Sequence, residues 1–168
     1  GNVIYTSTFS KILAPGLRLA WVVAPTEVIK KLVQAKQGCD LNTSTFNQYL
    51  AYEVANGPWM KTHIQRIRET YKERRDVMLN ALGEYMPEGV NWTHPKGGLF
   101  LWATTPESLD TQTIFKSAVE QKVAFVPGNS FHPLGGGQNT MRLNFSCMKP
   151  DLIDEGIKRL AEVIKNNL

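Results

Sequence analysis

Two short apolar segments separated by a polar loop constrain the fold of this chain most strongly. The first, NVIYTST at residues 2–8, is rich in β-branched and aromatic residues and predicts a buried strand. The second, LRLAWVVA at residues 17–24, is almost continuously apolar, which is typical of a strand covered on both faces. Pro25 ends this segment, and Thr26 is expected to cap a helix that extends to Gly38. Strand, loop, strand and helix in this order indicate the end of an α/β sheet.

The rest of the chain alternates between helical and extended patterns. Apolar residues at three- and four-residue steps predict a long helix from Met60 to Leu82 and a terminal helix over 149–168. Shorter patterns predict two further helices, over residues 45–54 and 110–122. They also predict strands over residues 99–104, 123–128 and 140–146, and a loop with one short strand over residues 86–98. The chain from about residue 45 onward is therefore expected to form an α+β layer of helices over a small sheet.

The composition excludes several classes of protein. Of the 168 residues, 42% are hydrophobic and 20% are charged. The net charge of +4 permits anionic ligands. The sequence has no arginine-rich tract that would favour binding of nucleic acid. Cys39 and Cys147 are expected to be reduced thiols in a cytoplasmic protein, and the three histidines show no ligand spacing, so no metal is expected. No apolar segment approaches the roughly 20 residues of a membrane span. Because the chain begins at Gly1 and runs directly into an apolar strand, we expect it to be part of a longer polypeptide.

The loop between the first two strands, TFSKILAPGLR, gathers an amine, two hydroxyls and a guanidinium group. Lys11 follows a predicted buried strand, where desolvation favours the neutral amine that forms a Schiff base with an aldehyde. Thr8 and Ser10 supply hydroxyl donors, and the planar guanidinium group of Arg18 suits a phosphate. A Pro-Gly pair within the loop is expected to reverse the chain, so that the guanidinium group returns toward the amine. A surface lysine at a strand end is the alternative, but the combination predicts a site for a carbonyl compound that bears a phosphate.

These residues also carry a resemblance to a known family. TFSKILAPGLRLAW resembles the lysine motif of fold-type I, pyridoxal-phosphate-dependent aminotransferases of class I/II, in which Ser/Thr, any residue, Ser and Lys precede an arginine. The resemblance implies that Lys11 binds pyridoxal 5'-phosphate covalently and that Thr8, Ser10 and Arg18 hold the cofactor phosphate. Ala20 stands where relatives usually carry glycine, a small departure.

A second match lies near the C-terminus. In NTMRLNFS, Arg142 corresponds to the family's arginine that binds the substrate α-carboxylate, although a strand arginine paired with a nearby acid is the alternative for this residue alone. PKGGLFLW and FVPGNSFH also resemble segments of the family, so the resemblance covers the whole chain. It is closest to the aminoadipate/kynurenine-type subgroup.

The resemblance implies both a fold and an activity. The expected fold is α/β: residues 1–44 end the sheet of the large cofactor-binding domain with two strands and a helix, and residues 45–168 form the α+β C-terminal small domain. The longer polypeptide is expected to be a cytoplasmic homodimer that transfers an amino group between an amino acid and a 2-oxo acid. The family places other cofactor contacts upstream of the lysine, including an acid that faces the pyridine nitrogen. We therefore expect the isolated chain to be inactive.

Two other classes of function remain alternatives. MocR/GntR-type transcriptional regulators fuse a DNA-binding domain to an aminotransferase-like effector domain with the same lysine motif, and the sequence upstream of Gly1 would distinguish them from enzymes. An aminotransferase fold that has lost its chemistry is the third alternative. Its weakness is that Lys11, Arg18 and Arg142 are all present.

Overall fold

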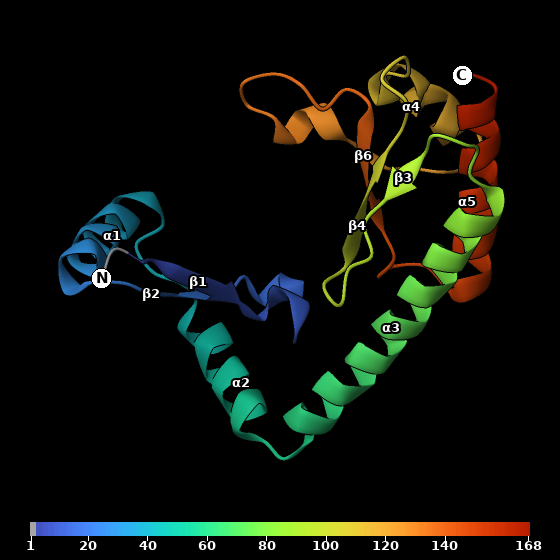
Figure 1. The fold of residues 1–168 in the computed structure, drawn as a ribbon. Coiled ribbons are helices and arrows are strands. Elements are labelled where there is room, and N and C mark those ends of the chain that lie inside the picture. Colours follow the sequence, from blue (N-terminus) through green and yellow to red (C-terminus); the bar gives the residue numbers. More distant parts are fainter. Residues whose placement is uncertain (1–2) are drawn as a thin grey trace. The chain divides into compact units, whose positions relative to one another are not determined.

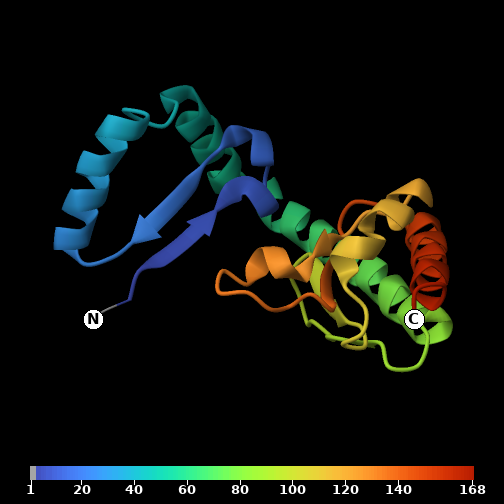
Figure 2. The ribbon, with the colours of Figure 1, turned by 90° about the horizontal axis from the view of Figure 1, so that it is seen from above.

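The computed structural model describes residues 3–168, which form two compact units. One unit ends at Ile67 and the other runs from Arg68 to Leu168, so the division falls within the long helix α3 (Trp59–Tyr85). Figures 1 and 2 show the ribbon in two views. The boundary predicted from the sequence, between residues 44 and 45, separates the cofactor-binding domain from the small domain. This boundary stays a prediction.

The first unit is built on a two-stranded antiparallel sheet. Strands β1 (Tyr5–Thr8) and β2 (Ala20–Val23) pair in register, with Thr8 opposite Ala20. Two short 3₁₀ turns, η1 (Phe9–Lys11) and η2 (Pro15–Leu17), lie in the loop between the strands. Two helices, α1 (Thr26–Cys39) and α2 (Thr45–Asn56), follow the sheet. The predicted strands and helices of this part of the chain are confirmed, and residue 2 of the first predicted strand lies outside the described residues.

The burial predicted for these two strands is wrong. Tyr5 of β1 is 54% exposed and Val23 of β2 is 60% exposed. Among the described residues the two strands pair only with each other, and most of their side chains stay exposed. The predicted cap is also wrong, because Pro25 occupies the N-cap position of α1 and Thr26 is the first helical residue.

The second unit is a four-stranded antiparallel sheet with helices packed against one face (Figures 1 and 2). The strands lie in the order β3–β4–β6–β5, with bounds β3 Asn91–Trp92, β4 Phe100–Thr104, β5 Val126–Pro127 and β6 Thr140–Asn144. The helical elements besides α3 are α4 Thr111–Glu120, η3 Gly128–Phe131 and α5 Pro150–Lys165. The predicted layer of helices over a small sheet is confirmed, although the strand predicted over residues 123–128 is shorter than expected.

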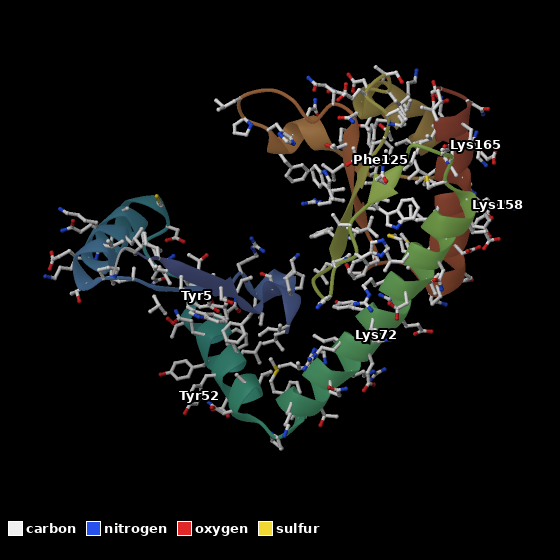
Figure 3. The ribbon with its side chains drawn as sticks, viewed as in Figure 1. Tyr5, Tyr52, Lys72, Phe125, Lys158 and Lys165 are labelled. Atoms are coloured by element: carbon white, nitrogen blue, oxygen red, sulfur yellow. The ribbon has the colours of Figure 1, made fainter. Side chains whose placement is uncertain are left out.

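Helix α5 provides much of the core of this unit. Its predicted apolar stripe is buried and comprises Ile153, Ile157, Leu160 and Ile164. Lys158 and Lys165 project from the outer side of the helix, and Phe125 lies within the core (Figure 3). A helical repeat of 3.6 residues places the apolar residues on one face, and this face packs against the sheet.

Residues of the two central strands alternate between the core and the opposite face of the sheet. Leu101 of β4 pairs with Leu143 of β6, and both side chains are buried in the core. Trp102 and Arg142 form the next pair along the strands, and their side chains are only partly buried. Because successive side chains of a strand point to opposite faces, Arg142 lies on the face of the sheet opposite the core.

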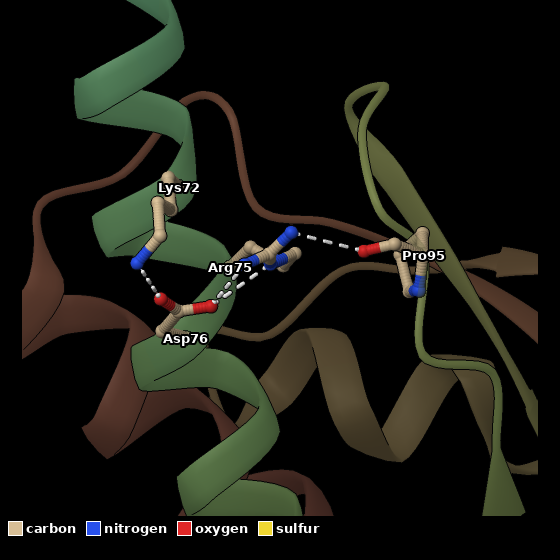
Figure 4. Close-up of polar contacts among 4 residues, drawn as sticks. All are labelled: Lys72, Arg75, Asp76 and Pro95. Carbon is tan, nitrogen blue, oxygen red and sulfur yellow. Dashed lines mark hydrogen bonds and ion pairs between the residues drawn. The ribbon is translucent and has the colours of Figure 1, made fainter.

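Polar contacts tie α3 to the turn that precedes β4 (Figure 4). Arg75 Nη1 donates a hydrogen bond to the Pro95 carbonyl oxygen at 3.1 Å, and Arg75 Nη2 donates to Asp76 Oδ1 at 2.6 Å. Lys72 Nζ donates to Asp76 Oδ2 at 2.9 Å. The hydrogen bonds from Lys72 and then from Arg75 lower the pKa of Asp76 below its usual value of 3.8.

The lowered pKa of Asp76 predicts a pH-dependent loss of stability in the variant Asp76→Asn. The Asp76 side chain is 39% exposed, so we expect a loss of about 0.2–1 kcal/mol at neutral pH, as for other exposed ion pairs. The pKa of Asp76 is lower in the folded chain than in the unfolded chain. The stabilisation by its carboxylate is therefore complete above pH 3.8 and disappears as the pH falls through the pKa of the folded chain. Urea unfolding of both proteins across this pH range measures the difference, with the exposed Glu107→Gln as a control. A difference that grows toward low pH would contradict the assignment.

Candidate active site

The loop from residue 8 to residue 18 brings two of the predicted site hydroxyls together. Thr8 Oγ1 lies 2.9 Å from Ser10 Oγ and 2.9 Å from the carbonyl oxygen of Leu19, and it accepts a hydrogen bond from the Ser10 backbone N–H at 3.0 Å. Thr8 thereby caps the turn η1 that ends at Lys11. The two hydroxyl groups and the amine consequently emerge from one turn of backbone.

Lys11 is exposed. The desolvated surroundings predicted from its place after a buried strand are therefore wrong. Its ammonium group has neither a hydrogen bond nor an ion pair with any described residue, so the amine is available to a ligand. The loop sequence contains two cations and no acid. This charge favours a phosphate group, because strong hydrogen bonds form when both the donor and the acceptor are charged.

The predicted Pro-Gly pair lies in the turn η2, and Arg18 closes this turn by donating its backbone N–H to the Pro15 carbonyl oxygen at 3.3 Å. Arg18 adopts the left-handed conformation with φ 53°, whereas Gly16 of the predicted Pro-Gly reversal does not require a positive φ. Its Nη1 donates to the Pro15 carbonyl oxygen at 3.1 Å, and the other nitrogens of the guanidinium group make no hydrogen bond in the described part of the chain. Left-handed backbone at a residue that is not glycine costs about 1–3 kcal/mol and concentrates at functional sites. No contact joins Arg18 to Lys11, although one loop carries both.

The loop is held in place by a residue that the sequence analysis missed. Asn47 Nδ2, from the first turn of α2, donates to the Leu17 carbonyl oxygen at 3.1 Å. Phe9 also donates its backbone N–H to Leu19 at 3.0 Å, and its ring lies 5.0 Å from that of Trp21. Asn47 carries no sequence signal beyond its place near the start of a predicted helix, since its partner lies thirty residues away along the chain.

Arg142 lies in the second unit, on strand β6, and has aromatic partners in place of an acid. Its guanidinium carbon lies 4.1 Å from the ring centre of Phe100 and 4.8 Å from that of Phe131. Arg142 forms no ion pair or hydrogen bond with any described residue. The alternative prediction, a strand arginine paired with a nearby acid, is therefore wrong for the described chain. Neither ring was predicted from the sequence, although Phe100 stands two positions from Trp102, the residue that pairs with Arg142.

The side chains of the loop and of β6 fit the chemistry of pyridoxal phosphate. Thr8, Ser10 and Arg18 offer hydroxyl and guanidinium donors to a phosphate, Lys11 offers an amine to an aldehyde, and Arg142 offers free donors to a carboxylate. The described residues contain no group of three or more His, Cys, Asp or Glu side chains arranged to hold a metal ion. None of the described helices has the length and apolar character needed to cross a membrane.

Comparisons with known proteins show which family this chain resembles. The chain is 52% identical over its whole length to an aromatic-amino-acid aminotransferase 1 of Thermococcus litoralis, and it spans 40% of that protein. The structure of LysN, an α-aminoadipate aminotransferase from Thermus thermophilus solved with N-(5'-phosphopyridoxyl)-L-leucine, matches 98% of the chain with a TM-score of 0.93 and 44% identity, and the chain covers 42% of it. An uncharacterized HTH-type transcriptional regulator of Bacillus subtilis, YisV, is 31% identical over 98% of the chain, which covers 34% of it.

The family comparison covers nearly all of the chain. The sequence profile of the family described as aminotransferase class I and II matches residues 1–160. The match includes both the lysine loop and the strand that carries Arg142, and the structural match confirms the predicted fold. The chain belongs to the aminotransferase class I and II family.

Proposed function

We propose that this chain is the C-terminal part of a pyridoxal-phosphate-dependent aminotransferase, which transfers an amino group between an amino acid and a 2-oxo acid. The chain spans about two fifths of the relatives that it matches. In this proposal residues 1–44 complete the cofactor-binding domain and residues 45–168 form the small domain. The full-length protein is a cytoplasmic homodimer, with no nucleic acid or membrane among its partners.

The observation that carries the proposal is a single loop that carries Lys11, Thr8, Ser10 and Arg18. Lys11 would hold the cofactor through its aldehyde, and its amine would move a proton at the substrate Cα as general base and acid. The two hydroxyl groups and the guanidinium group of Arg18 hold the phosphate. The cofactor, when bound, supplies the electron sink for the reaction.

Arg142 binds the substrate carboxylate in this proposal. Its guanidinium group has no acidic partner among the described residues, so its donors remain available for a bidentate contact with a carboxylate. A carboxylate held in this way fixes the orientation of the amino acid, and orientation of this kind is a large part of enzymatic rate enhancement.

The regulator alternative stays in second place. It is supported by 31% identity to the transcriptional regulator YisV, against 52% identity to the aromatic-amino-acid aminotransferase. A winged-helix DNA-binding domain encoded upstream of residue 1 would indicate that the full-length protein is a regulator. A short N-terminal arm followed by the rest of a cofactor-binding domain would select the enzyme.

Covalent attachment of the cofactor tests the proposal directly. We expect the full-length polypeptide, incubated with pyridoxal phosphate and reduced with borohydride, to carry the phosphopyridoxyl group on the peptide that contains Lys11. Peptide mass spectrometry locates the modified residue, and Lys11→Ala serves as the control that removes the label. A label that stays at full yield on another lysine in this variant would overturn the assignment of Lys11.

A further inference from the structure

The aromatic surroundings of Arg142 suggest how this side chain is held. A partly buried cation in a protein is usually neutralised by a carboxylate, yet no described acid pairs with Arg142. Its guanidinium carbon instead lies above two rings, 4.1 Å from the centre of Phe100 and 4.8 Å from the centre of Phe131. Contacts at these distances are attractive, because the face of an aromatic ring is electron-rich.

Strand pairing places the first ring. Phe100 of β4 lies opposite Asn144 of β6, and Arg142 is two residues from Asn144 on the same face of the sheet. Phe100 and Arg142 are therefore diagonal neighbours across two hydrogen-bonded strands, a separation that long and aromatic side chains span. Because Leu101 and Leu143 are buried in the core on the other face, the register of this pair of strands cannot slip without exposing the core.

The segment after β5 places the second ring. Phe131 ends the turn η3, and its ring packs edge-to-face against that of Trp102 with the centroids 5.3 Å apart. The turn begins at Gly128, where a Cβ atom would lie 1.8 Å from Thr140 Oγ1, so only glycine allows η3 to approach β6 this closely. Asn129 donates a further hydrogen bond to Gln112 of α4. Phe131 is 43% exposed, and the turn that carries it is closed by a hydrogen bond from the His132 backbone N–H to the Asn129 carbonyl oxygen at 3.1 Å.

Aromatic partners and acidic partners differ in what they leave to a ligand. An acid would occupy the N–H groups of the guanidinium and would compete with an incoming carboxylate. A ring offers the guanidinium only its electron-rich face and no carboxylate oxygen, so it competes less than an acid would with a ligand for the N–H groups. The side chain thus loses conformational freedom before the ligand arrives and keeps its donors, which is the condition for preorganised binding.

We infer that Phe100 and Phe131 are positioning residues for the carboxylate site, holding the guanidinium group of Arg142 in its binding conformation in place of an acidic partner. This inference rests on the proposed function of Arg142. Neither ring is required to touch the substrate, since each acts through the arginine.

The test compares variants of Phe131 in the full-length enzyme loaded with its cofactor. Phe131→Leu keeps the apolar bulk but removes the ring, and we expect it to raise KM for both the amino acid and the 2-oxo acid by about two- to fivefold, the size of one exposed cation–π contact. The value of kcat should change less, because Phe131→Leu leaves Arg142 in place to orient the bound substrate. Phe131→Tyr keeps a ring and should restore both KM values. Phe115→Leu, which changes a half-buried phenylalanine of α4 that packs on Phe125, is the matched control.

A spectroscopic readout separates this inference from the proposed function. In full-length protein labelled with ¹⁵N-arginine, we expect the Nε–Hε resonance of Arg142, assigned with Arg142→Lys, to move when Phe131→Leu removes the ring current. Phe100→Leu should move the same resonance, and Phe115→Leu should not.

The KM values distinguish the positioning role of the two rings from the carboxylate role of Arg142. If Arg142→Lys raises both KM values but Phe131→Leu changes neither, the positioning role is overturned and the carboxylate role stands. If Arg142→Lys leaves both KM values unchanged, the carboxylate role fails and the positioning role fails with it. Equal KM effects of Phe131→Leu and Phe115→Leu would show that packing alone is responsible, which also overturns the inference.

Discussion

Replacing Lys11 with alanine in the full-length polypeptide is expected to lower kcat by about 10²- to 10⁴-fold, the contribution of a positioned general acid–base group. The variant loses the amine that attaches the cofactor and the group that moves the substrate proton. The fold should survive, because Lys11 is exposed and its side chain makes no hydrogen bond or ion pair in the described part of the chain. Transamination measured with an amino acid and a 2-oxo acid under saturation gives kcat for both proteins.

Lys30 provides the matched control for this experiment. It lies on α1 in the same unit, its side chain is 63% exposed, and it pairs with Glu27 at 2.9 Å. Lys30→Ala removes an equal charge and an exposed ion pair of little energetic value, so kcat should stay unchanged. If Lys11→Ala retained turnover within tenfold of the natural protein, or if Lys30→Ala lost as much activity, the role assigned to Lys11 would be wrong.

Truncating Leu160 to alanine is expected to destabilise the second unit by about 2–5 kcal/mol, the range for a leucine removed from a packed core. Leu160 is fully buried on α5 and belongs to the core that α3, α4, α5 and the sheet share. The loss combines the apolar surface no longer removed from water with the contacts missing around the cavity. Urea unfolding followed by far-ultraviolet circular dichroism measures the difference in free energy of unfolding.

The same helix supplies the control for the core substitution. Leu152 lies on α5 and is 54% exposed. Leu152→Ala should change the free energy of unfolding by about 0.5 kcal/mol or less, as for most surface substitutions. Equal losses from the two variants would contradict the packing of α5 described here.

The periodic elements were predictable because their signal is local. The stripe from Ile153 to Ile164 repeats with the period of a helix, and the structure buries it as predicted. The long helix α3 and the alternating strand β4 follow from the same kind of pattern. The candidate loop was also local, since Thr8, Ser10 and Lys11 stand within four consecutive residues and share one turn.

Burial in the first unit could not be predicted in this way. An apolar strand such as β2 indicates that its faces are suited to contact with other elements, but the sequence does not say which elements cover them. In the described chain the two strands pair only with each other, so side chains such as Val22 and Val23 stay exposed. The Pro-Gly pair is a common signal for a turn, and the turn η2 contains it. The left-handed backbone at Arg18 was not predictable, because arginine has no preference for this conformation.

The sequence by itself determined the periodic helices and strands, the chemical groups of the lysine loop and the presence of an arginine near the C-terminus, because each depends on residues close together in the chain. Only the tertiary structure decided what surrounds Arg142. Its two rings come from β4 and η3, and β4 reaches β6 through a pairing of residues about forty positions apart. Contacts of this kind depend on strand register and on the path of a loop, which the packing of the whole unit sets.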